Sequence, residues 1–390
     1  MTDMWHAGAP QFWRRSPVTS VLAPLMGQAR WRVCGGVGVP AAFSSRGEEE
    51  ASLRTGAAFT DRSWLSTYLV SGAEAARLLD RVQTRDVSQL QVGHSMRTAA
   101  VDDEGRLIDL CTVYRLEEDV FQLAGEVAIG AWLARAAAHF AVALEETTGS
   151  LACLQLVGPA IGALLDALGA AQGDRLAAGA MELVEDGSLA FHLCRRGPGT
   201  PDAYEMWFSA VTAEHAMRRL LALGETVGLR PVGADAFEAL RIATGQPRAF
   251  AEFEPAILAR ERAHARTPFA CGAGGLVDLD KPFSGRRALL AAARAPAPRP
   301  VRLAIEGFAA ARGQSLRAGA SLVGVLTSAA VSPSRGASLA LGFLDAEPAP
   351  GAALEAVGAA GPMRARILGA FEPDPGGPKP RFGRRHGDGG

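Results

Sequence analysis

An internal repeat constrains the fold of this chain more than any other feature of its sequence. Residues 70–82 read VSGAEAARLLDRV and residues 156–168 read LVGPAIGALLDAL. Gly72 matches Gly158 at an offset of 86 residues, and the Leu-Leu-Asp triplets at 78–80 and 164–166 keep the same offset. Two copies indicate a duplicated supersecondary unit, because a solenoid needs at least three repeats.

The segments around the two copies predict the same order of elements. In the first copy, a helix is expected after residue 71, strands at 96–101, 107–116 and 120–124, and a second helix at 129–143. In the second copy, a strand at 151–157 leads into a helix ending near residue 168. A β region at 181–208, interrupted at 197–199, then precedes a helix at 213–224. This β-α-β-β-α-β order, found twice, predicts two ferredoxin-like units related by a pseudo-twofold axis.

The pattern changes after residues 293–300, which read ARAPAPRP and are typical of a linker. Short strands punctuated by Gly and Pro are expected at 301–306, 321–328, 338–344 and 363–368. They predict a small all-β barrel or sandwich. The tail beyond residue 373 is expected to be disordered.

Composition limits the classes of partner and site. The chain has 40 Lys+Arg against 41 Asp+Glu, which argues against nucleic acid or a membrane as the main partner. Its five widely spaced cysteines contain no C-x-x-C pair, and its histidines form no metal-ligand pair, so we expect buried thiols and no metal site. No secretory signal and no transmembrane run is visible, which predicts a cytoplasmic protein.

Five stretches, in the right order, resemble one family. They are a D-R-S then V-S-G opening at 61–72, LQLVGPAIGALL at 154–165, GADAFEALRIATGQP at 233–247, DKPFSGRRALL at 280–290 and GVLTSAAVSP at 324–333. Together they resemble the glycine-cleavage T-protein (aminomethyltransferase) and folate-dependent demethylase superfamily. The iron–sulfur assembly members of this superfamily carry a K-G-C-Y-x-G-Q-E signature, which is absent from DKPFSGRRA.

The resemblance implies an α+β fold in which the duplicated ferredoxin-like units form a ring with a central folate channel, followed by a C-terminal β-barrel. It divides the chain into an N-terminal segment completing the ring (1–55), a first unit (56–150), a second unit with a helical extension (151–292), the barrel (301–372) and the tail (373–390). It implies tetrahydrofolate as the cofactor, with no metal, and a small-molecule methyl or aminomethyl donor. The oligomeric state stays open.

Glu205 is the residue that the resemblance assigns to folate binding. It matches the last Glu of the family's G-Y-T-G-E-D-G-x-E-I motif. A carboxylate suits the pteridine edge, which offers an N–H and an NH₂ side by side. The alternative is a strand Glu that faces solvent. The family's Gly-Tyr-Thr-Gly reads GPGT at 197–200, so the tyrosine of that motif is missing.

Asp109 and Leu110 decide the chemistry that we expect. The family stretch G-G-I-I-D-D-L-V-V-Y places its catalytic acid at the second Asp, which is Leu110 in this sequence, while Asp109 matches the first. Neighbouring strand residues point to opposite faces, so Asp109 needs a bulge or a register slip to act as the acid. Otherwise Asp109 is a partly solvated or paired strand residue. True glycine cleavage is therefore not expected.

The opening motif and the stretch around Asp109 supply further candidates. Asp61 is a candidate catalytic acid, as are Asp109 and Tyr114, while Ser63 and Trp64 are candidate folate contacts. Trp64 could stack on a ligand or belong to the core.

Two other stretches depart from the family. Its V-N-A-A-N reads LAGEV at 123–127, and its Ala-Arg-Asp reads Ala-Phe-Glu at 236–238, so an asparagine and an arginine are lost. Arg241 remains as a candidate folate contact or as a brace of its helix. Arg62, Arg97 and Arg286 are candidates for the replacement charge, and the sequence does not choose among them.

These residues leave three functions open. The first is a tetrahydrofolate-dependent one-carbon transferase, which would be tested by measuring turnover of methylated donors. The second is a non-catalytic folate-binding protein in regulation or assembly, and the third is a scaffold without folate. Retention of Asp61 and Glu205 favours the transferase, whereas the eroded motifs favour the second.

Overall fold

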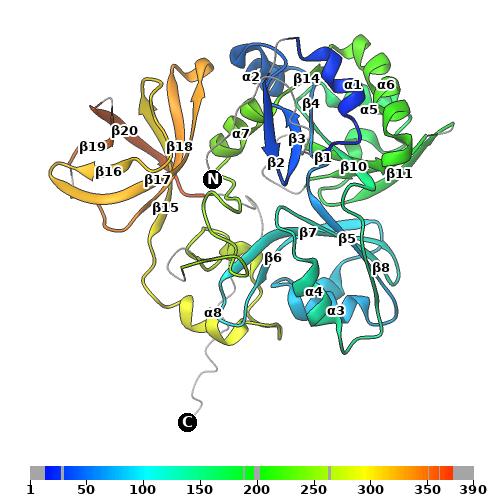
Figure 1. Cartoon of the computed structure of the whole chain (residues 1–390), viewed down its shortest axis with the longest axis horizontal. Helices are drawn as coiled ribbons and strands as arrows, with labels where there is room; N and C mark the ends of the chain where they lie inside the picture. Colours follow the sequence, from blue (N-terminus) through cyan, green and yellow to red (C-terminus); the bar gives the residue numbers. More distant parts are fainter. Residues whose placement is uncertain are drawn as a thin grey trace.

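The computed structural model describes residues 14–27, 30–187, 189–196, 203–261, 265–349, 351–359 and 361–371. The expected disordered tail and the expected loop at 197–200 lie outside the described residues. Figure 1 shows a barrel on the left and two stacked α+β units on the right. No helix in the described ranges is long and apolar enough to cross a membrane.

The first unit is a five-stranded sheet of order β6-β7-β8-β5-β9 with its helices packed against it. Its apolar core is continuous with residues of the barrel and of the segment between 242 and 289. Its elements are β5 (Ser66–Ser71), α3 (Ala75–Val82), β6 (His94–Val101), β7 (Leu107–Glu117), β8 (Val120–Gly125), α4 (Gly130–Ala137) and β9 (Ala143–Glu146).

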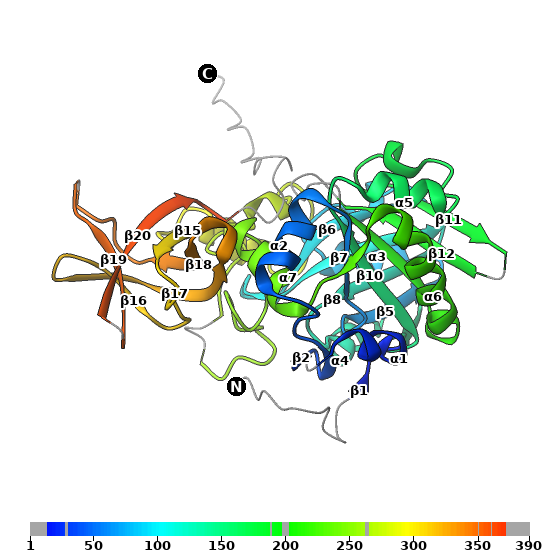
Figure 2. The same cartoon turned by 90° about the horizontal axis from the view of Figure 1, so that it is seen from above.

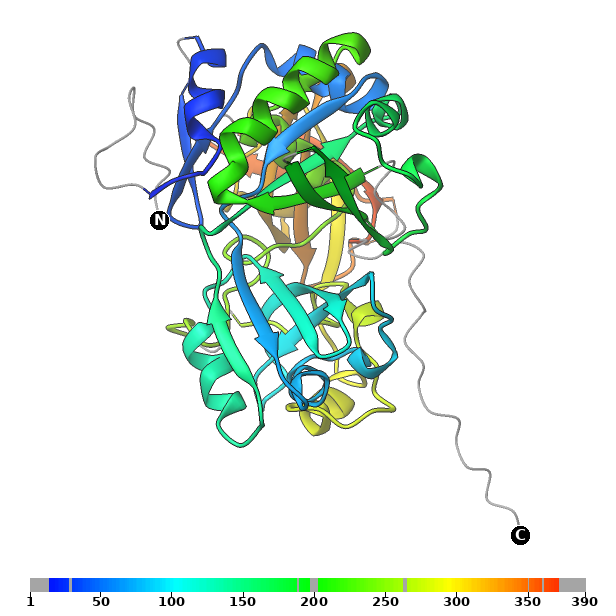
Figure 3. The ribbon, with the colours of Figure 1, turned by 90° about the vertical axis from the view of Figure 1, so that its right-hand side faces the viewer.

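The second unit repeats this plan in a six-stranded sheet of order β11-β12-β13-β10-β4-β14. Figure 3 shows it above the first unit, seen from the side away from the barrel. Its elements are β4 (Ala58–Asp61), β10 (Leu151–Val157), α5 (Ile161–Ala167), β11 (Met181–Asp186), β12 (Leu189–Arg195), β13 (Ala203–Ser209), α6 (Ala213–Gly224) and β14 (Arg230–Pro231).

The repeat seen in the sequence is present in the backbone. Gly72 and Gly158 have φ of 120° and 121°, and at both positions a Cβ would overlap a carbonyl oxygen of a neighbouring segment. The two sheets also join symmetrically, because the Ser95 N–H donates to Gly179 O (2.6 Å) and the Met181 N–H donates to Gly93 O (2.7 Å). These pairs keep the 86-residue offset and confirm the duplicated architecture.

Two elements differ from the sequence expectation. The helix expected at 129–143 ends at Ala137, and β9 follows as an edge strand whose Leu144 is opposite Val70 of β5. β4 directly precedes β5 in the chain, yet it pairs with β10 and therefore lies in the sheet of the second unit. This crossover ties the units together just where the opening motif lies.

The remaining elements flank the two units. Helix α2 follows a capping box in which Ser45 and Glu48 bond to each other's backbone N–H, and α7 packs between α2 and the barrel strand β17. Figure 2, seen from above, shows the barrel beside α7. The bounds are β1 (Arg14–Arg15), α1 (Thr19–Leu22), β2 (Trp31–Cys34), β3 (Val37–Pro40), α2 (Arg46–Thr55), α7 (Ala234–Ala243), α8 (Arg286–Ala292), β15 (Arg299–Glu306), β16 (Ser315–Ala318), β17 (Ser321–Ser332), β18 (Ala337–Leu344), β19 (Leu354–Gly358) and β20 (Gly361–Gly369).

Candidate functional site

Two adjoining hollows lie where the two units meet α7. The smaller hollow has an empty volume of about 440 Å³, and the larger has about 830 Å³, both including open solvent. The two hollows share six lining residues: Arg62, Arg97, Glu126, Arg196, Pro247 and Arg248.

Glu205 lines the smaller hollow and is 2% exposed. It lies on β13 opposite Gln155 of β10, in the middle of the second sheet. The Tyr114 hydroxyl donates to its Oε2, and Arg196 forms an ion pair with its Oε1. Burial alone raises the pKa of this carboxyl, but Arg196 and the Tyr114 hydroxyl outweigh burial and lower the pKa below its ordinary value. Glu205 is thus a buried, charged carboxylate at a cavity wall and does not face bulk solvent.

The chemistry of Glu205 fits a pteridine edge. A carboxylate offers about four lone-pair sites, and Tyr114 and Arg196 occupy one on each oxygen. One site on each oxygen remains for a pair of adjacent N–H donors. Burial raises the pKa of Tyr114 well above its usual value, so its hydroxyl remains a donor, and its ring packs edge-on against Trp207 at 5.7 Å.

Asp109 lines the same hollow, and β7 carries a bulge just before it. The register runs from Ala100 opposite Asp109 directly to Val101 opposite Leu107, which leaves Ile108 as the extra residue. The register is regular from Asp109 to Arg115, so this bulge does not move Asp109 into the position of Leu110, although both residues line the smaller hollow. Of the alternative of a partly solvated or paired strand residue, the structure fits the paired form, since Asp109 is 1% exposed and hydrogen-bonded.

The Asp109 carboxyl is held by backbone donors. Its oxygens accept from the Leu110 N–H (2.8 Å) and the Val127 N–H (3.0 Å). A Cβ at Gly125 would overlap Oδ2, so this glycine makes the room. Burial raises the pKa of Asp109 to about 7, where a side chain can both release and accept a proton near neutral pH.

Asp61 and Ser63 form a second buried acid site at the end of β4. Asp61 lines the larger hollow and is 7% exposed. Its Oδ1 accepts the Ser63 N–H (2.9 Å), whereas its Oδ2 is buried without a hydrogen-bond partner among the described residues. Burial raises the pKa of Asp61 and favours its neutral form. Ser63 bonds to the backbone of Cys153 and is not among the residues lining either hollow, so its contacts fix Asp61 and the β4–β10 pair.

Trp64 is placed both at a hollow and in an apolar cluster. It lines the larger hollow, and it also belongs to an apolar cluster at the junction of the units with Tyr114 and Trp207. The Arg62 guanidinium carbon lies 5.0 Å from the Trp64 ring centroid and 5.3 Å from that of Phe237.

The structure separates the three candidates for replacement charge. Arg62 and Arg97 line both hollows. Arg286 lines neither, and its Nε donates to Leu279 O (2.7 Å).

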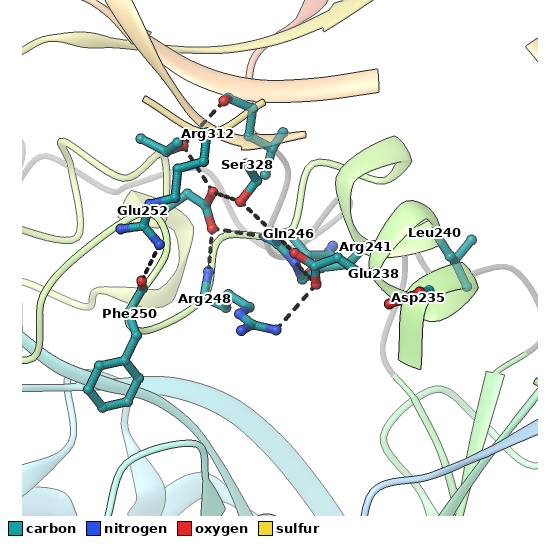
Figure 4. Close-up of polar contacts among 12 residues, drawn as sticks. Asp235, Glu238, Leu240, Arg241, Gln246, Arg248, Phe250, Glu252, Arg312 and Ser328 are labelled. Atoms are coloured by element: carbon teal, nitrogen blue, oxygen red, sulfur yellow. Dashed lines mark hydrogen bonds and ion pairs between the residues drawn. The ribbon is translucent and has the colours of Figure 1, made fainter. Parts of the chain in front are cut away.

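Arg241 acts as a brace between α7 and the barrel (Figure 4). Its Nε and Nη2 donate to Glu238, and Nη2 also donates to Ser328 of β17. Its Nη1 donates to Glu252 and to the Gln246 carbonyl. These partners account for all five N–H groups, so the bracing alternative describes Arg241 in this structure and none of its donors remains for a ligand.

Sequence reasoning missed three residues of the site: Glu126, Arg196 and Arg248. Arg196 follows the end of β12, and Arg248 follows the Gln-Pro of a matched motif, so neither occupies a motif position. Glu126 lies in the 123–127 stretch, which differs from the family motif. That difference was the one sign in the sequence that pointed to this residue. Within the described ranges, no group of three or more His, Cys, Asp or Glu is arranged to hold a metal ion.

Comparison with known proteins agrees with this architecture. Residues 25–281 match the model of the GCVT N-terminal domain family. The aminomethyltransferase of Saccharopolyspora erythraea is 29% identical over 337 residues, covering 84% of this chain and 88% of the relative. That of Streptomyces coelicolor is 30% identical over 329 residues, covering 80% and 85%.

A solved structure shows the same fold at lower identity. The glycine cleavage system aminomethyltransferase T from Bartonella henselae superposes with a TM-score of 0.78 at 20% identity, over 91% of this chain and 96% of that chain. The likeness extends through the barrel that follows the matched domain. Sequence match and architecture together establish that this chain belongs to the GCVT N-terminal domain family.

Proposed function

We propose that this chain is a tetrahydrofolate-dependent one-carbon transferase that takes a methyl or methylene group from a small-molecule donor. Its relatives are named as aminomethyltransferases, which supports the reaction class. The observation that carries the proposal is Glu205, a charged carboxylate that is 2% exposed and forms part of a cavity wall between the two units.

Glu205 would hold the cofactor by its pteridine edge, with Arg196 and Tyr114 fixing the carboxylate. Tetrahydrofolate, when bound, supplies the nitrogen that accepts the one-carbon unit. Trp64 would form an apolar wall of the site. The function of the protein is then to hold the donor in line with that nitrogen and to exclude water.

Asp109 and Asp61 would manage protons. A methyl group is transferred from an oxygen more easily when that oxygen, which is the leaving group, is protonated. Asp109, with a pKa of about 7, can deliver that proton and recover it at neutral pH. Asp61 is the second candidate acid, because its burial favours the protonated form and its Oδ2 has no described partner.

We further propose that the reaction is not glycine cleavage. Leu110 stands where the resembling family has its catalytic aspartate, and its side chain lines the smaller hollow. Leucine cannot orient an amine or carry charge. The same substitution favours the alternative function, a non-catalytic folate-binding protein in regulation or assembly.

Calorimetric titration with tetrahydrofolate tests the binding half of the proposal. Wild type should bind, and Glu205→Gln should bind far more weakly. Arg218→Gln, on the exposed face of α6, is the control and should bind like wild type. If wild type shows no binding, both folate functions fail.

Turnover then separates the transferase from the alternative. A panel of O-, S- and N-methyl donors is incubated with the protein and tetrahydrofolate, and methylated or methylene folate is measured. Product that requires Asp109 supports the transferase. Tight folate binding with no product across the panel supports the non-catalytic protein.

A further inference from the structure

Arg62 differs in its partners from four of the five other arginines that line the hollows. Arg32, Arg196, Arg241 and Arg248 each form an ion pair with a carboxylate, as the distances to Asp235, Glu205, Glu238 and Glu252 show. Arg62 has no carboxylate of the described residues within 4.0 Å. Its side chain makes one long hydrogen bond, from Nη1 to Gln155 Oε1 (3.4 Å), and its Nε is buried without an acceptor among the described residues.

Two aromatic rings hold this guanidinium in place. Trp64 lies beside Arg62 in the chain, and Phe237 reaches it from α7. Rings at these distances attract a cation electrostatically, but they accept none of its in-plane hydrogen bonds. The rings therefore position the positive charge without forming an ion pair with it, and Arg62 lines both hollows.

The neighbouring acid does not supply the missing negative charge. Asp61 precedes Arg62 directly, yet its carboxyl bonds to Ser63 and not to the guanidinium. The charge of Glu205 interacts with Arg62 at longer range, but Glu205 forms its ion pair with Arg196. A charge that is half withdrawn from water and left unpaired is costly, so a site of this kind is completed by a negative ligand group.

We propose that Arg62 is an anion-recognition residue that binds a carboxylate of the ligand in the larger hollow through its planar fork of N–H donors. Two sources could provide that group: the glutamate tail of folate or a carboxylate on the one-carbon donor. The inference rests on the proposed function for the identity of the ligand, but it concerns a different residue from Glu205: Arg62 lines both hollows, whereas Glu205 lines only the smaller one. A guanidinium matches a carboxylate with two parallel hydrogen bonds, which an ammonium does not.

Equilibrium binding to wild type, Arg62→Gln and Arg62→Lys tests the proposal, with Arg218→Gln as the matched surface control. Two ligand pairs distinguish the sources. Tetrahydrofolate and 6-methyltetrahydropterin differ in the carboxylate tail, while methoxyacetate and methoxyacetamide are a charged and a neutral probe of the donor. Thermal unfolding of each variant verifies that it is folded.

Arg62→Gln should weaken the binding of one carboxylate ligand by about tenfold or more, since a hydrogen bond to a charged group contributes about 1.5–3 kcal/mol. Arg62→Lys should recover part of this loss, and the neutral partner of the affected pair should bind unchanged. If only tetrahydrofolate binds more weakly to Arg62→Gln, the site belongs to the folate tail. If only methoxyacetate binds more weakly, the site belongs to the donor.

The proposal would be overturned if every carboxylate ligand bound equally well to wild type and Arg62→Gln. It would also be overturned if the charged and the neutral ligand of a pair lost affinity to the same extent. Failure of the proposed function has a different signature. In that case neither tetrahydrofolate nor the pterin binds to wild type, whereas an Arg62-dependent preference for methoxyacetate over its amide persists.

Discussion

Glu205 in the second unit and Gln122 in the first occupy equivalent positions. Glu205 lies opposite Gln155 in the β10–β13 register, and Gln122 lies opposite Leu69 in the β5–β8 register. Leu69 and Gln155 are 86 residues apart, as are Gly72 and Gly158. Yet Glu205 is paired on both oxygens at a cavity wall, whereas the buried Nε2 of Gln122 has no partner among the described residues and Gln122 lines neither hollow.

The same contrast holds for the strand before. Tyr114 lies opposite Gln122 and Cys194 lies opposite Glu205, so Tyr114 and Cys194 are also equivalent. Of these two residues, only the tyrosine donates to Glu205, whose other oxygen pairs with Arg196. The duplication therefore supplies a symmetric backbone, and different polar side chains of the two units build the site across it.

The largest effect should come from the acid that the first unit alone provides. Asp109→Asn is uncharged at every pH, whereas the wild-type carboxyl has a pKa raised from 3.8 to about 7. A raised carboxyl pKa contributes stability that is complete below about pH 4 and is lost as the pH rises to about 7. At about 1.4 kcal/mol per pKa unit, the stability of wild type relative to the variant should fall by about 4 kcal/mol between pH 4 and pH 8.

Urea unfolding of both proteins across this pH range measures the change. Arg218→Gln is the control and should follow wild type at every pH. A constant difference between wild type and Asp109→Asn would show that Asp109 titrates normally and is not poised for proton transfer.

The next effect tests whether the two halves of the scaffold are equivalent. Gly72→Ala and Gly158→Ala should each cost on the order of 3 kcal/mol, because each adds a Cβ at a φ near 120° and against a carbonyl oxygen. Chemical denaturation measures both, with Gly351→Ala as the control for a left-handed φ in open space. A cost confined to one of the two glycines would break the structural symmetry.

The repeat was readable because it depends on local patterns. Strand and helix periodicity and the glycine turns carry it within each copy. The pairing of β4 was not predictable. Its four residues precede a strand of the first unit, and no local pattern shows that they pair with β10 of the second unit. The strand at 143–146 was hidden for a similar reason, since its place is decided by pairing with β5.

Three acids of the site and the cations Arg62 and Arg97 were predictable, whereas Glu126, Arg196 and Arg248 were not. Glu205, Asp109 and Asp61 follow strand patterns that a family motif identifies, and the structure brings all three to the hollows. Arg196 reaches Glu205 from the neighbouring strand β12, and Arg248 reaches the cavity from an irregular segment. Their positions are set by tertiary packing, which no local pattern encodes.

The smallest effect concerns the contact that joins the units. Tyr114→Phe removes the hydroxyl that donates to Glu205 and keeps the ring against Trp207. Binding of tetrahydrofolate should weaken about tenfold, because a hydrogen bond to a charged group is lost while the ion pair with Arg196 remains. Competition binding measures it, and an unchanged affinity would mean that the first unit makes no contribution through this residue.

The asymmetry between Glu205 and Gln122 is tested most directly by calorimetric titration of tetrahydrofolate into wild type, Glu205→Gln and Gln122→Leu. Two charge-assisted hydrogen bonds to the pteridine edge predict a loss of about a hundredfold or more in Glu205→Gln. Gln122→Leu should match wild type. Equal dissociation constants for wild type and Glu205→Gln, with both proteins folded, would contradict the account.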